Sequence, residues 1–119
     1  QYEMNYYKNN KDRIEIFWGK DKKEWNLKHL ENILKNKNVY ITFDVDSFDS
    51  SIMPATGTPE PGGLLWEEVL HLIKNVCKIS NVVGADINEL SPIKNFDSYN
   101  FLVAKLAYKI LTYVFEFKN

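Results

Sequence analysis

Two aspartates close the most strand-like segment of the chain, and their spacing suits a cation site. Residues 39–45 (VYITFDV) are β-branched and aromatic, which is typical of a buried strand. Side chains alternate along a strand, so Asp44 and Asp46 are expected on one face, roughly 6–7 Å apart. Neighbouring carboxylates repel each other unless a positive charge lies between them. The pair therefore predicts a site for one or two hard cations. Asp49, three residues further on, would orient the two aspartates without binding the cation itself. The alternative is a solvated acidic loop.

Two other uses of an Asp-x-Asp spacing fit this segment poorly. A calcium loop of the EF-hand type needs glycine at its sixth position and glutamate at its twelfth, where this chain has Asp49 and Ala55. A phosphatase of the haloacid dehalogenase type would call for Thr or Val at the position of Phe48. The calcium loop therefore fails, and the phosphatase is a less favoured hypothesis.

A longer motif around the aspartates is much more specific. Residues 41–63 (ITFDVDSFDSSIMPATGTPEPGG) closely resemble the aspartate signature of the ureohydrolase family, the manganese enzymes that include arginase and agmatinase. Residues 84–92 (GADINELSP) are similar to the next block of that family, at the right distance. The stretch GTPEPGG, residues 57–63, favours the agmatinase branch, and the resemblance covers about residues 39–111.

The resemblance implies a role for each matching residue. Asp44 would bridge two Mn²⁺ ions and Asp46 would bind the second ion. Thr58 would lie beside the substrate, and Glu89 would pair with its guanidinium group. A hydroxide shared by the ions would attack the guanidinium carbon of an agmatine-like compound, giving urea and an amine. A homo-oligomer, a trimer or hexamer, is also implied.

The elements that must position these residues alternate along the chain. Hydrophobic spacing predicts helices over residues 26–37, 65–79 and 97–115, and strands over 13–18, 39–45 and 81–88. This order indicates an α/β fold with a parallel sheet and flanking helices, and the resemblance makes it an incomplete part of a three-layer α/β/α domain. Ligands of such sheets bind beyond the carboxyl ends of the strands, where Asp44, Asp46 and Glu89 would meet.

Composition limits the classes of binding partner and the cellular location that can be expected. The 119 residues carry a net charge of -1 and a single arginine, Arg13, which argues against nucleic acid. The lone Cys77 cannot form an internal disulfide, so a cytoplasmic location is the default expectation. No stretch is apolar and long enough to predict a membrane span.

The sequence also lacks part of what the resemblance requires. The histidines and further aspartates of the family belong to two blocks N-terminal to this region, and the only histidines, His29 and His71, fall inside predicted helices with a structural role. Residues 1–119 are therefore expected to be the C-terminal part of one ureohydrolase-like domain and inactive alone. The alternative is a non-catalytic ureohydrolase-like module or inactive fragment that packs against a partner. The last helix has an aromatic surface, predicted as core or subunit contact, formed by Tyr108, Tyr113, Phe115 and Phe117.

Overall fold

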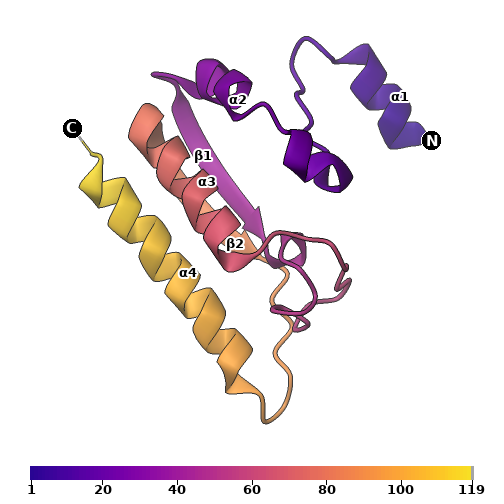
Figure 1. Cartoon of the computed structure of the whole chain (residues 1–119), viewed down its shortest axis with the longest axis vertical. Coiled ribbons are helices and arrows are strands. Elements are labelled where there is room, and N and C mark those ends of the chain that lie inside the picture. The colour runs from indigo at the N-terminus through magenta and orange to yellow at the C-terminus, as the bar shows by residue number, and fades with distance from the viewer. Residues whose placement is uncertain (119) are drawn as a thin grey trace.

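A pair of parallel strands forms the centre of the computed structural model, which describes residues 1–118 (Figure 1). Strand β1 (Asn38–Asp44) pairs with β2 (Asn81–Asn88) from Asn38↔Asn81 to Asp44↔Asn88, with one irregularity after Val39. Parallel strands need a crossover connection, and helix α3 (Trp66–Ile79) supplies it. Both carboxyl ends consequently lie at the same edge of the sheet.

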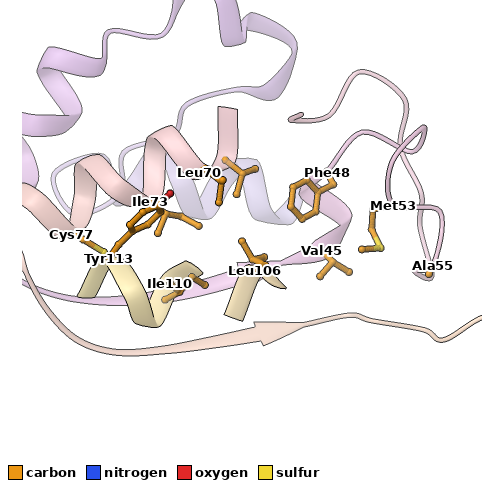
Figure 2. Packing of buried hydrophobic residues seen from close by; sticks show 11 residues of the cluster. Val45, Phe48, Met53, Ala55, Leu70, Ile73, Cys77, Leu106, Ile110 and Tyr113 are labelled. Carbon is orange, nitrogen blue, oxygen red and sulfur yellow. The ribbon is translucent and has the colours of Figure 1, made fainter. Parts of the chain in front are cut away.

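Helices α3 and α4 (Asp97–Glu116) bury one face of this sheet. In α3 the buried residues recur every three or four positions, as an apolar stripe requires, and α4 packs its own stripe against them. The core continues beneath the loop that follows β1, where Val45, Phe48, Met53 and Ala55 are almost fully buried (Figure 2). The buried apolar side chains of the loop thus hold it against the hydrophobic core.

The N-terminal third differs from the sequence prediction. The strand expected over residues 13–18 is wrong: this segment is irregular, between α1 (Tyr2–Asn9) and the 3-10 helix η1 (Gly19–Glu24). A strand needs a neighbour for its backbone hydrogen bonds, and the described residues place none beside it. Helix α2 (Leu27–Leu34) is confirmed, and the side chain of Asn26 accepts a hydrogen bond from the His29 N–H at its start.

The fold class is confirmed as an incomplete α/β arrangement. The sheet of the described chain has two strands where three were expected, and its second face is lined by polar side chains and by Tyr40, which is 60% exposed. Parallel sheets normally bury both faces. None of the helices described, over residues 1–118, has the length and apolarity needed to cross a membrane.

Candidate active site

The two aspartates lie at the carboxyl end of β1, but not in the way that strand alternation predicts. β1 ends at Asp44, whose Oδ1 accepts a hydrogen bond of 2.8 Å from the Asp46 N–H. This bond caps a short 3-10 helix, η2 (Val45–Ser47), so Asp46 belongs to a turn and not to the strand. The expectation of two residues on one strand face is wrong, because the Asp44 side chain redirects the backbone.

Asp46 has one carboxylate oxygen held by protein and one that is not. Its Oδ2 accepts a hydrogen bond from the Thr58 hydroxyl, which ties the start of the loop between β1 and α3 to a later part of the same loop. Its Oδ1 is buried and has no hydrogen-bond partner among the described residues. A buried, unsatisfied polar atom is costly, and a charged one more so. The missing partner has to be a donor or a cation.

Glu89 follows the end of β2 directly and is the third carboxylate of this edge. The register pairs Asp44 with Asn88, so Glu89 comes just beyond the level of Asp44. Its φ of 66° lies in the left-handed region that non-glycine residues seldom adopt, and its side chain is exposed. Such backbone conformations cluster at ligand sites, where they aim a side chain that regular strand geometry would point elsewhere.

Asp49 closes the loop between β1 and α3. Its carboxylate accepts hydrogen bonds from the Ser51 hydroxyl, the Ser51 N–H (2.9 Å) and the Gly62 N–H (2.7 Å). These bonds, the Ser51 hydroxyl first, lower the pKa of Asp49 below its ordinary value of 3.8. The bonds found for Asp49 in the described structure stay within the loop, so its orienting effect on Asp44 and Asp46 stays a prediction.

The lowered pKa of Asp49 predicts a pH-dependent loop. A carboxyl group whose pKa is lower in the folded state stabilises the fold well above pH 3.8, and this contribution is lost as the pH falls through the folded pKa. We expect Asp49→Asn to unfold more easily at neutral pH and to lose less stability between about pH 5 and pH 2. Urea unfolding across that range measures both effects. Asp12→Asn, in an exposed turn, should keep the wild-type pH profile.

Gly63 marks the place where the end of the loop crosses its beginning. A Cβ built at this position would lie 2.5 Å from the Phe48 carbonyl carbon and 2.6 Å from the Asp49 nitrogen, both backbone atoms. The Leu64 N–H donates to the Ser47 carbonyl and the Asp49 N–H to the Leu64 carbonyl on either side of this contact. Only glycine permits such a close approach.

We therefore expect Gly63→Ala to separate the two crossing segments and to destabilise the protein by about 2 kcal/mol. Thermal unfolding of the purified variant measures the loss. Gly57→Ala is the matched control, because a Cβ there meets nothing within 4 Å. Equal melting temperatures for the two variants would contradict the proposed contact.

A polar ladder on the open face of the sheet was missed by the sequence analysis. The Thr42 hydroxyl donates to Asp86 Oδ1 at 2.7 Å, and the Asn88 side chain donates to both Thr42 (3.1 Å) and Asp86. The bond from Thr42 is the main reason that the pKa of Asp86 is lowered. The available signal was the placement of polar residues at alternate positions of both strands, ending at Asp44 and Asn88.

A cavity of about 380 Å³ opens at Asp46, between the long loop and the segment around η1. Ser47, Glu60 and Trp25 are among the residues that line it. Lys22, which also lines it, donates to the Gly63 carbonyl (2.8 Å) and to Glu68 (3.1 Å) and so fixes η1 to the loop. Sequence reasoning could not find Lys22, since 41 positions separate it from Gly63.

The two histidines, which could also bind a metal ion, lie away from this edge of the sheet. His29 is on α2, with Nε2 3.5 Å from Glu15, and His71 lies on the exposed surface of α3. Over residues 1–118 no three side chains of His, Cys, Asp or Glu gather closely enough to hold a metal ion. Asp44 and Asp46 can therefore form part of a metal site, with further ligands from outside this set.

The chain is similar to known proteins in sequence and in fold. Residues 2–113 match the model of the arginase family. The chain is 39% identical over 103 residues to an N(1)-aminopropylagmatine ureohydrolase of Synechocystis, covering 84% of this chain and 33% of that protein. It is 41% identical over 73 residues to an agmatinase of Pyrococcus horikoshii, covering 61% and 26%.

Among solved structures, proclavaminate amidino hydrolase from Streptomyces clavuligerus has a TM-score of 0.73 at 27% identity, over 85% of this chain and 36% of that one. The chain thus spans about a third of the length of the relatives that it matches.

Proposed function

The chain belongs to the arginase family, and we propose that the complete protein uses two Mn²⁺ ions to hydrolyse an agmatine-like guanidino compound to urea and an amine. The names of the relatives, ureohydrolase and agmatinase, support this reaction class. The signature carrying Asp44, Asp46, Thr58 and Glu89 lies within the matched residues. A cytoplasmic location is part of the proposal, since the one cysteine, Cys77, is free and buried.

One observation carries the proposal: the buried Oδ1 of Asp46 has no hydrogen-bond partner among residues 1–118, at the sheet edge where ligands of α/β folds bind. Carboxylate oxygens are ligands that Mn²⁺ accepts, and Asp44, whose Oδ1 accepts from the Asp46 N–H, supplies a second carboxylate at this end of β1. These two residues would hold the metal from one side. Bound metal supplies an acidified water and polarises the group to be attacked.

The other site residues position what binds there. The Thr58 hydroxyl holds Oδ2 of Asp46 and so fixes the direction in which Oδ1 points. Glu89 offers an exposed carboxylate beyond the end of β2, and a planar guanidinium can donate two parallel hydrogen bonds to such a group. The rigid loop keeps Thr58 and Asp46 together, because Asp49 and Gly63 close it. Binding and orientation of the cation would thus be the contribution of this chain.

Urea release by the complete protein tests the proposal. After loading with Mn²⁺ it should release urea from agmatine or an aminopropyl derivative of agmatine, and a chelator should remove the activity. Absence of urea from every guanidino compound offered to the folded, metal-loaded protein would contradict the proposal. Such a protein would instead fit the alternative, a non-catalytic module that acts through packing with a partner.

A further inference from the structure

Polar side chains line the open face of the sheet where the two strands reach the candidate site. Strands β1 and β2 run side by side to this edge (Figure 1). Thr42 lies opposite Asp86 in the register, and Asp44 lies opposite Asn88. Because side chains alternate along a strand, these four project from the same face. Asn88 is the last residue of β2 and directly precedes Glu89.

Three of these side chains form a closed set of hydrogen bonds. The Thr42 hydroxyl donates to Asp86 Oδ1 at 2.7 Å, and the Asn88 amide donates to the Thr42 oxygen at 3.1 Å and to Asp86 Oδ1. Each residue is bound to both of the others, and two of the three bonds cross between the strands. A flipped Asn88 amide would set its oxygen against the Asp86 carboxylate, so the amide has one favourable orientation. We call Thr42, Asp86 and Asn88 the cross-strand clamp.

Tyr40 supports the clamp from the side away from the site. Its ring lies over Gly84, its partner in the register, where an added Cβ would come within 2.7 Å of Tyr40 Cε2. Hydrogen bonding to Asp86, followed by the negative charge of that carboxylate, raises the pKa of Tyr40 above its ordinary value of 10.0. The Asp86 carboxylate thus contacts side chains of both strands, which fixes its direction.

The stability of the sheet does not require this polar set. On the other face of the same strands Ile41, Phe43 and Ile87 pack against the hydrophobic core, and parallel sheets usually carry such residues on both faces. Removing a charge from water costs free energy, and apolar side chains of similar volume often stabilise a protein at least as well. A charge held by specific hydrogen bonds favours one geometry instead. The clamp is therefore explained by what it positions.

The residue that the clamp can position is Glu89. The pair Asp44↔Asn88 ends the register of the sheet, and the chain leaves the strand conformation at Glu89, with a φ of 66°. The Asn88 side chain ties this last residue of β2 to Thr42, two positions before Asp44 on the neighbouring strand. We propose that the cross-strand clamp positions the Glu89 carboxylate relative to Asp44. This inference rests on the proposed function, in which Asp44 holds the metal and Glu89 the guanidinium group.

The spacing of these two carboxylates matters for the proposed reaction. Asp44 would set the place of the metal and Glu89 that of the guanidinium carbon, and small displacements of reacting groups lower rates strongly. Without the clamp, Glu89 would keep its charge and lose its fixed direction. Asp44 and Asp46 would keep their own hydrogen bonds, with the Asp46 N–H and the Thr58 hydroxyl. Loss of the clamp should therefore weaken substrate capture and leave the affinity for Mn²⁺ nearly unchanged.

Steady-state kinetics and Mn²⁺ titration of the complete protein test the clamp. We expect Asn88→Ala to raise KM about tenfold for agmatine or its aminopropyl derivative, whichever the wild type hydrolyses, with kcat and Mn²⁺ affinity within about twofold of wild type. Asn81→Ala is the matched control, because it removes a bond of 2.7 Å to Asn38 across the same strands, at their other end. Its KM should equal that of wild type. An unaltered KM in folded Asn88→Ala would overturn the proposal, and so would parallel losses of substrate capture, Mn²⁺ affinity and melting temperature, which indicate a structural role.

A double-mutant cycle shows whether Asn88 acts through Glu89. In the Glu89→Gln background, Asn88→Ala should have almost no further effect on KM, because the group that it positions has already lost its charge. Additive effects of the two substitutions would contradict the proposal.

Thr42 gives an independent pair of variants. Thr42→Val keeps the shape of threonine without the hydroxyl and should raise KM as Asn88→Ala does, whereas Thr42→Ser keeps the hydroxyl and should restore most of the substrate capture. Equal KM values for these two variants would also overturn the proposal. A wild type that releases no urea contradicts the proposed function and this inference together. An active wild type whose KM is unchanged by Asn88→Ala and Thr42→Val contradicts this inference alone.

Discussion

Replacing Asp46 with alanine in the complete protein is expected to reduce urea release by about a thousandfold or more, with little effect on the fold. The change removes Oδ1, the buried oxygen for which the described chain offers no partner, and Oδ2, which the Thr58 hydroxyl holds. Losing the first relieves an unfavourable charge in the metal-free protein, and losing the second costs one exposed hydrogen bond. The two effects on the free energy of unfolding oppose each other and should nearly cancel.

Two measurements separate this role from a structural one. Metal should raise the melting temperature of the wild type, as any ligand of the folded state does, and should raise that of Asp46→Ala much less. Asp46→Asn keeps the side-chain shape and the acceptor for Thr58 but lowers the charge, so it should also lose activity. Asp12→Ala, the same substitution in an exposed turn, should retain full activity. Urea release by Asp46→Ala within a few-fold of wild type would contradict the assignment.

Glu89→Gln is expected to weaken capture of the substrate more than it slows turnover. Glutamine fills the same space at the end of β2 but carries no charge, so a guanidinium group would lose one partner of an ion pair. Removing one member of such a pair costs enough to lower kcat/KM by about a hundredfold or more, mostly through a higher KM. Steady-state kinetics with several guanidino compounds measure the effect.

The control for Glu89 is another exposed glutamate, at a position away from the end of β2. Glu67→Gln, in the first turn of α3, should leave KM unchanged. The structure of Glu89→Gln should be intact, since glutamine meets the same backbone demand at a φ of 66°. If turnover of all the compounds is unaltered in Glu89→Gln, the carboxylate does not bind the guanidinium.

Much of the fold could be predicted because its signals are local. Helical spacing identified α2, α3 and α4, and β-branched runs identified β1 and β2, to within a few residues of their observed bounds. The strand expected at residues 13–18 failed, because pairing depends on a neighbour that sequence periodicity does not reveal. Helix α1 was missed because its sequence, YEMNYYKN, shows no apolar stripe at helical spacing.

The candidate site, like the fold, could be predicted only in part from the sequence. The sequence by itself determined the types and order of the site residues, through a motif in which Asp44, Asp46, Thr58 and Glu89 hold fixed places. Only the tertiary structure decided that Asp46 leaves the strand, that Thr58 binds it, and that Lys22 fixes the loop from 41 positions away. The sequence states residue identity and spacing directly, whereas hydrogen bonds between distant residues depend on how the loops cross in space. Strand alternation fails at Asp46 for this reason: its N–H donates to the Asp44 carboxylate, and the backbone enters the turn of η2.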